Sequence, residues 1–123
     1  MAATSAQAFD PGAETCPMRQ VLDQIGSRWT VLVVNALAEG PLRYTELSRR
    51  VSGISAKMLT QTLRTLERDG LISRTVYAVV PPRVDYEITA LGATLEEPIA
   101  ALQEWAGANM PSVLAARGAY DAR

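Results

Sequence analysis

The chain has 123 residues, of which 48% are hydrophobic, and its formal net charge is −1. This length predicts one domain with a modest core, and the hydrophobic content excludes a chain that is disordered throughout. The lack of histidine and the single cysteine exclude a zinc site with the usual nitrogen and sulfur ligands, and also Ser-His-Asp and Cys-His catalysis within one chain. No glycine-rich phosphate loop or dinucleotide motif occurs, so we expect no enzyme, no cofactor and no metal.

We expect neither membrane insertion nor export. The longest apolar candidate, Trp29–Ala38, is interrupted by Thr30 and Asn35 and is shorter than the roughly 20 residues that span a bilayer. Residues 1–14 lack the cationic start and the apolar stretch of a signal peptide. The sequence therefore predicts a cytoplasmic protein with a flexible N-terminal tail over 1–14.

Two helices are predicted after this tail. The first covers Pro17–Ile25, because proline suits the first helical position, and it ends at Gly26-Ser27. The second covers Arg28–Ala38 and is apolar on nearly all sides, which predicts a central buried position.

The next two predicted helices match the helix-turn-helix pattern. A brief helix over 42–51 is joined by a short glycine-containing connection to a longer helix. The longer helix begins after Ser55, a good N-cap, and ends at Gly70, which tolerates the left-handed backbone found at helix ends.

The longer helix has two opposite faces. Leu59, Leu63 and Leu66 recur at i, i+4 and i+7 and line one side. A helix that buries such a stripe and presents a cationic, amide-bearing stripe has the geometry to enter a DNA major groove. The residues that project to the opposite side are Lys57, Gln61, Arg64 and Arg68.

Beyond Gly70 the periodicity changes from helical to alternating. Residues 71–77 and 83–88 are predicted to form two strands joined at Pro81-Pro82, a hairpin "wing" whose tip would carry Arg74 or Arg83. A long helix over 91–108 follows. Met110-Pro111 is expected to interrupt it, with a last turn or two over 111–116.

Positive charge is concentrated in the middle of the chain. Between Arg43 and Arg83 eight residues are basic and three are acidic, a balance of +5, and the rest of the chain is acidic. This asymmetry favours a nucleic-acid-binding face. The alternative is a solvated surface that happens to be rich in arginine.

Five segments together are similar to a known family: Cys16-Pro17 and residues 25–34, 40–47, 53–74 and 81–92. In this order they resemble the HxlR-type winged helix-turn-helix transcriptional regulators of bacteria, which are MarR-like. The resemblance covers about Cys16 to Trp105 and implies a mainly α fold with a small β-hairpin. It also implies a homodimer, whose N- and C-terminal helices form the interface, and a palindromic DNA operator bound by the third and fourth helices and the wing.

The residues themselves agree with a dimer. The helix over 91–108 has a continuous apolar stripe and only one hairpin to pack on, so a second subunit would bury the surplus. We expect a winged helix-turn-helix domain with dimerisation helices over 15–108 and a partly helical C-terminal extension over 109–123.

The candidate DNA contacts lie on the longer helix, before it and on the wing. Glutamine can pair with adenine and arginine with guanine, and a helix N-terminus favours a phosphate. The candidates are Arg43, Ser55, Lys57, Thr60, Gln61, Arg64, Arg68, Arg74 and Arg83.

Several of these candidates have a plainer interpretation. Ser55 can simply cap the helix, Arg64 can be a solvated charge, and Arg68 can pair with an acidic neighbour. The wing arginines can charge an exposed strand edge. Tyr44 could touch a phosphate, but filling the core is the preferred interpretation.

Cys16 has two interpretations that stay open. It directly precedes a helix and lies within a turn of Arg19, and both favour a reactive thiolate. In several members of the resembled family a cysteine at this motif senses oxidants, electrophiles or quinones. A lone cysteine allows a sulfenic acid, a mixed disulfide or a bridge to a second subunit. The alternative is a small residue packed at a dimer interface.

Trp29 and Trp105 are large apolar side chains near the predicted core and dimer helices. They could border a pocket for an aromatic effector, although packing is the preferred interpretation.

The sequence thus favours a dimeric DNA-binding transcriptional regulator that responds to an oxidant or a small molecule. A protein-interaction module on the same scaffold is the alternative, and acidic or apolar residues in place of Gln61 and Arg64 would have favoured it. A cysteine-dependent enzyme is disfavoured because no base accompanies the thiol.

Overall fold

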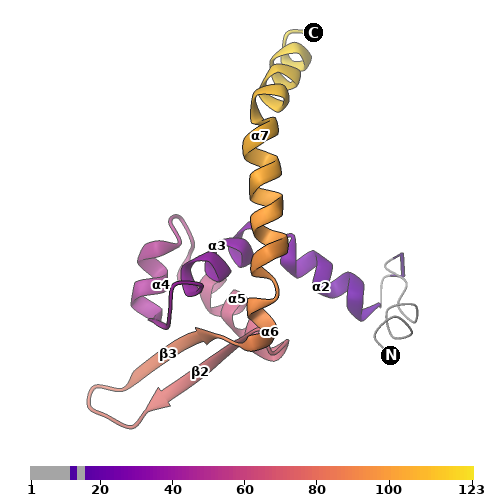
Figure 1. The fold of residues 1–123 in the computed structure, drawn as a ribbon. Helices are drawn as coiled ribbons and strands as arrows, with labels where there is room; N and C mark the ends of the chain where they lie inside the picture. Colours follow the sequence, from indigo (N-terminus) through magenta and orange to yellow (C-terminus); the bar gives the residue numbers. More distant parts are fainter. Residues whose placement is uncertain (1–11, 14–15) are drawn as a thin grey trace.

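The computed structural model describes residues 12–13 and 16–123, and its described part is mainly helical with a small sheet. This confirms the predicted fold class. Figure 1 shows the last helix rising as a long rod from the rest of the chain, while a β-hairpin projects away from it. In chain order the elements are α2 (Pro17–Ile25), α3 (Arg28–Leu37), β1 (Leu42–Arg43), α4 (Tyr44–Arg50), α5 (Ala56–Arg68), β2 (Ile72–Tyr77), β3 (Arg83–Ile88), α6 (Ala90–Ala93) and α7 (Glu96–Asp121).

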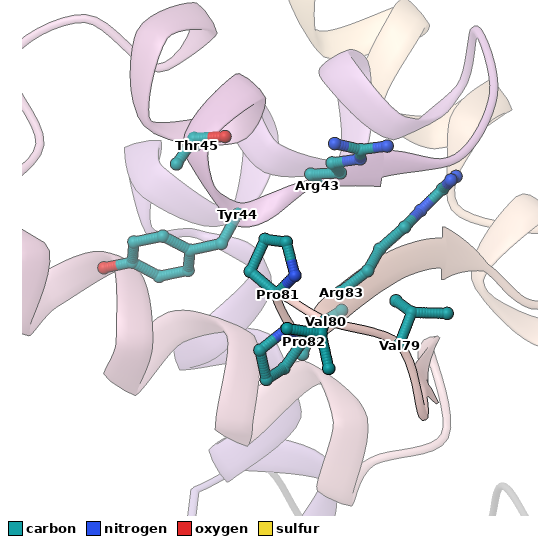
Figure 2. Close-up of a pocket in the computed structure, with 9 residues that line it drawn as sticks. Arg43, Tyr44, Thr45, Val79, Val80, Pro81, Pro82 and Arg83 are labelled. Carbon is teal, nitrogen blue, oxygen red and sulfur yellow. The ribbon is translucent and has the colours of Figure 1, made fainter.

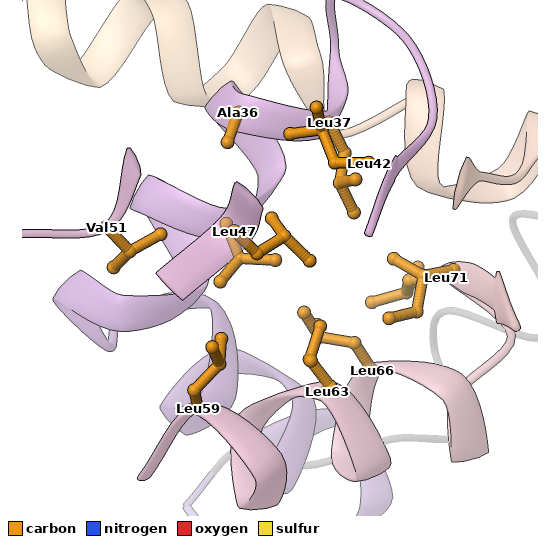
Figure 3. Packing of buried hydrophobic residues seen from close by; sticks show 11 residues of the cluster. Ala36, Leu37, Leu42, Leu47, Val51, Leu59, Leu63, Leu66 and Leu71 are labelled. Atoms are coloured by element: carbon orange, nitrogen blue, oxygen red, sulfur yellow. The ribbon is translucent and has the colours of Figure 1, made fainter. Parts of the chain in front are cut away.

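A single hydrophobic cluster joins α3, α4, α5 and the start of the wing. Figure 3 shows the leucines of α5 pointing toward Leu47 of α4 and toward Leu42 and Leu71. Each fully buried leucine of this kind stabilises the fold by about 1.5–3 kcal/mol relative to an exposed one. The cluster comprises Val33, Ala36, Leu37, Leu42, Leu47, Val51, Leu59, Leu63, Leu66, Leu71 and Ile72.

The two predicted N-terminal helices are confirmed. α2 begins at Pro17, and Gly26 and Ser27 separate it from α3. α3 buries Val33, Val34 and Leu37 as expected of a central helix, although Leu32 on its far side stays exposed.

α5 forms as its local sequence dictates. The hydroxyl of Ser55 accepts a hydrogen bond from the backbone N–H of Met58 at 3.1 Å, which satisfies an otherwise unpaired donor of the first turn. Gly70 adopts φ 75°, the left-handed conformation that ends the helix. The predicted cap, stop and buried stripe are therefore confirmed.

The predicted helix over 42–51 is wrong at its start. Leu42 and Arg43 are instead a short strand, β1, paired antiparallel with Tyr86 and Asp85 of β3. Pairing with β3 holds these two residues extended, and Arg43 is the N-cap of α4, with its backbone N–H donating to the carboxylate of Glu46, so the helix starts only at Tyr44. The sheet consequently has three strands in the order β1-β3-β2, rather than a hairpin alone.

The hairpin is confirmed in its predicted range. β2 and β3 pair antiparallel from Ile72 opposite Ile88 to Tyr77 opposite Arg83. Only the end near the core is buried, because Ile72 is covered while the rest of β2 is exposed. The hairpin therefore extends into solvent beside α5.

The C-terminal region differs from prediction in two ways. The expected single helix over 91–108 is divided into α6 and α7, since Thr89 caps a separate short turn by accepting from the N–H of Gly92 at 3.0 Å. The expected break at Met110-Pro111 does not occur, because α7 continues through Pro111 to Asp121.

Pro111 removes one backbone donor, and the carbonyl four residues earlier belongs to Gly107 on an exposed turn where water can reach it. The amide of Asn109 donates to the carbonyl of Trp105 at 2.9 Å and reinforces the preceding turn. Residues 109–121, expected to be only partly helical, thus extend α7. The expected flexible tail over 1–14 lies outside the described residues except for 12–13.

Candidate nucleic-acid interface

The outer face of α5 is cationic and accessible. Lys57, Gln61, Arg64 and Arg68 are all exposed, opposite the buried Leu59, Leu63 and Leu66. Lys57, Arg64 and Arg68 form no ion pair with any residue that the structure describes, so the alternative of a pair between Arg68 and an acidic neighbour is not realised. An open depression runs along this face, lined by Ala56, Lys57, Thr60, Gln61, Arg64 and Thr65.

Thr60 differs from the other predicted contacts because it is partly buried. Its hydroxyl lies 3.2 Å from the hydroxyl of Tyr44, which donates to the carbonyl of Ala56 at 3.1 Å. Tyr44 also packs against the core, as predicted. This group fixes α4 to the first turns of α5 and sets the angle between the two helices of the helix-turn-helix.

Ser55 and Arg43 lie at the N-terminal ends of α5 and α4. Ser55 is exposed although its hydroxyl caps the helix, so the cap leaves the helix end open to an anion. The backbone N–H of Arg43 donates to the carboxylate of Glu46 at 3.0 Å, while the Arg43 side chain is exposed.

The two wing arginines are held by carboxylates. Arg83 donates twice to Asp85, with both nitrogen–oxygen distances 2.9 Å, and its guanidinium lies 5.1 Å from the centre of the Tyr77 ring. The hydrogen bond from Arg83 lowers the pKa of Asp85, and the same bond raises the pKa of Arg83. Arg74 lies near Glu67 of α5, with 3.5 Å between its Nε and a carboxylate oxygen.

The tip of the wing is apolar, which corrects the prediction of an arginine there. Arg74 pairs with Tyr86 in the middle of the hairpin, and Arg83 begins β3 behind the tip. The loop itself carries Val79, Val80 and two prolines, and Val80 is fully exposed.

The wing loop faces the start of α4 across a second depression. Figure 2 shows Pro81 and Pro82 beside Tyr44, with the side chains of Arg43 and Arg83 extending toward the same side. The depression is thus apolar at the loop and cationic at one edge.

Cys16 and the tryptophans lie away from this surface. Cys16 is buried, with 7% of its surface exposed, and Arg19 donates to the carbonyl of Gly12 at 3.2 Å. Trp29 is half-buried against the core, and the guanidinium of Arg28 lies 4.3 Å from its ring centre. Trp105 is 61% exposed on α7, so it does not pack into the core of this chain.

Sequence reasoning missed three parts of this surface: β1, the apolar loop of the wing and the contact between Glu67 and Arg74. The loop could have been found from the run Val79-Val80-Pro81-Pro82, which contains no charge. The other two depend on residues brought together by the fold. Among the described residues, no helix is long and apolar enough to cross a membrane.

Comparison with known proteins agrees with this architecture. A model of the HxlR-like helix-turn-helix family matches residues 24–113. The HTH-type transcriptional regulator YtfH of Escherichia coli K12 is 50% identical over 105 residues, which cover 85% of this chain and 83% of that protein.

Solved structures give the same result. The transcriptional regulator ytfH from Salmonella typhimurium has 45% identity and a TM-score of 0.82, covering 89% of this chain and 98% of its own. The redox regulator HypR in its oxidised form has 39% identity and a TM-score of 0.69, covering 76% and 97%. The fold is a winged helix-turn-helix, and both the family model and these relatives match most of the chain. The chain therefore belongs to the HxlR-like helix-turn-helix family, whose members are transcriptional regulators and not enzymes.

Proposed function

We propose that this regulator binds a palindromic DNA operator as a cytoplasmic homodimer, with α5 in the major groove and the wing on the neighbouring backbone or minor groove. The observation that carries the proposal is the unobstructed stripe of Lys57, Gln61, Arg64 and Arg68 on α5. Its side chains can read base edges and contact phosphates, while the leucines behind them hold the helix on a rigid core.

The proposed dimer rests on apolar surface that the described part of the chain leaves uncovered. On α7 only Ile99 is buried, whereas Leu102, Trp105 and Leu114 are exposed. Leu22 on α2 is exposed as well. Two-fold pairing of these helices would remove the apolar surface from water and place two copies of α5 on symmetric half-sites.

In vitro selection of DNA sites tests this function. The expected result is a palindrome whose half-sites lie about 10 bp apart or a multiple of that spacing. A dimer that makes about 6–8 phosphate contacts should lose roughly 10³-fold in affinity between 50 and 200 mM salt. Selection of no preferred sequence, with binding that salt does not weaken, would instead favour the protein-interaction module.

A second candidate is a response to oxidants through Cys16. It is supported by the position of this single cysteine at the N-cap of α2 and by the likeness to a redox regulator. Its burial in the described structure supports the packing alternative, because a covered thiol reacts slowly.

The Cys16→Ser variant separates the two roles. If Cys16 is the sensor, oxidation changes the operator affinity of the wild-type protein and leaves that of the variant unchanged. An equal response in both proteins removes the sensor role, and the serine variant then reports only on packing.

A further inference from the structure

Glu67 is an acidic residue inside the cationic surface formed by α5 and the wing. It lies between Arg64 and Arg68 in the sequence, and one of its carboxylate oxygens is 3.5 Å from the Nε of Arg74 on β2. Thr60, Leu63, Arg64 and Tyr86 line the same small depression. A carboxylate at this position repels a DNA phosphate, and a neighbouring arginine offsets part of this repulsion.

The two ion pairs of the wing differ in strength. Arg83 and Asp85 form two hydrogen bonds of 2.9 Å, and the side chain of Asp85 is only 12% exposed. Arg74 and Glu67 make a single contact, and their side chains are 46% and 40% exposed. The first pair fixes Arg83 on β3, whereas the second is solvated and can exchange partners.

The consequence of the weaker pair is electrostatic. Glu67 cancels the charge of Arg74 in the free protein, so the unpaired cations near α5 are those of its outer face and not those of the wing. A phosphate must displace the carboxylate before Arg74 can contribute to binding. Such a displacement requires that α5 and β2 both lie in direct contact with the duplex.

We propose that Glu67 masks Arg74 and thereby raises the specificity of DNA binding, an inference that rests on the proposed function. On random DNA the base contacts of α5 are missing, and Arg74 stays with Glu67. On the operator, base contacts by Gln61 and Arg64 draw the surface close enough for a phosphate to take Arg74 from the carboxylate. Glu67 is then a specificity-determining residue that touches no base.

The Glu67→Gln variant tests the mask through binding to random DNA. Freeing one arginine adds about one phosphate contact per engaged subunit. For each such subunit the salt dependence steepens by ~0.9, and the affinity at 0.1 M salt, relative to that at 1 M, rises by about eightfold. Operator affinity is expected to rise less, so the ratio of specific to random binding falls. Glu104→Gln, the same charge change on the exposed side of α7, is the matched control and should leave this ratio unchanged.

The Arg74→Gln background shows whether Glu67 acts through Arg74. In that background the Glu67→Gln exchange should no longer raise the affinity for random DNA. An equal rise with and without Arg74, or no rise in the single variant, overturns the inference. Thermal unfolding verifies that the variants are folded, and the midpoint should stay near that of the wild-type protein because the pair is exposed.

Failure of the proposed function has a different signature. In that case the wild-type protein selects no operator at all, and no ratio of operator affinity to random-DNA affinity exists for Glu67 to change. Normal operator selection by the wild-type protein together with an unaltered specificity ratio in Glu67→Gln rejects the masking role alone.

Discussion

Gly92 illustrates how a single residue positions the wing. It lies in α6, against the turn that follows α5, and an added Cβ would lie 2.0 Å from the carbonyl oxygen of Leu71 and 2.7 Å from a side-chain carbon of Ile88. Thr89 strengthens the same junction by donating to the carbonyl of Gly70 at 2.6 Å. The end of α5, the start of β2 and the end of β3 thus meet where only a glycine fits.

Replacing Gly92 by alanine should therefore lower the free energy of unfolding by about 1–3 kcal/mol through overpacking. Gly118→Ala is the matched control, since an added Cβ meets nothing within 4 Å on the exposed surface of α7. Chemical denaturation measures both variants, and equal stability of the two would show that the junction relaxes freely.

At the scale of elements, α7 shows that an exposed helix can continue through a proline. Pro111 lies inside the 26 residues of α7. An interior proline costs about 3 kcal/mol relative to alanine, because it removes a hydrogen bond and crowds the preceding turn. The remaining turns, together with the side-chain bond of Asn109, keep the helix intact.

Pro111→Ala should accordingly raise the thermal midpoint, with a gain of about 1–3 kcal/mol in the free energy of unfolding. Differential scanning calorimetry measures the change, and Ser112→Ala is a control at the neighbouring exposed position. A lower midpoint for the proline variant would mean that the proline is needed where it stands.

The helices and strands also show which structural features can be predicted from the sequence. The cap, the buried leucines and the glycine stop of α5 are local signals, so the helix and its two faces were predicted in full. β1 has two residues and exists because Leu42 and Arg43 pair with Tyr86 and Asp85 far along the chain. Pairing between residues so far apart in the sequence cannot be predicted from a local sequence pattern.

The same limit applies to the candidate interface. The stripe on α5 was predicted from helical spacing, and in the structure its side chains are exposed, as expected. The partners of Arg74 and Arg83 did not follow, because Glu67 meets Arg74 only when β2 lies against the end of α5. The roles of the interface residues in DNA binding stay predictions.

At the scale of the whole molecule, cationic side chains and the apolar face of α7 lie on different elements. Eight cationic residues lie between Arg43 and Arg83, around α4, α5 and the wing, whereas α7, which projects away from the wing (Figure 1), carries exposed Leu102, Trp105 and Leu114. The loop of the wing adds a smaller apolar surface at Val79 and Val80. These two surfaces are the ones that the proposal assigns to DNA, at α5 and the wing, and to a second copy of the chain, at α7.

Leu102→Asp should convert the proposed dimer to a monomer, because a charge in an apolar interface must be desolvated without a partner. Gln103→Asp, on a helix direction about 100° away, is the control and should keep the dimer mass. Sedimentation velocity distinguishes the two, and a wild-type protein that sediments as a monomer would contradict the proposed pairing.

Recognition of the DNA sequence by the outer face of α5 is tested most directly with the variants Gln61→Ala and Arg64→Ala. The measurement is the affinity of each variant for the selected operator and for random DNA of equal length. Loss of a base contact should weaken operator binding by about 1–3 kcal/mol per contact while changing random binding much less. Arg117→Ala, an exposed cation on α7, should change neither. Unchanged operator affinity in both α5 variants would contradict the claim that the outer face of α5 recognises the DNA sequence.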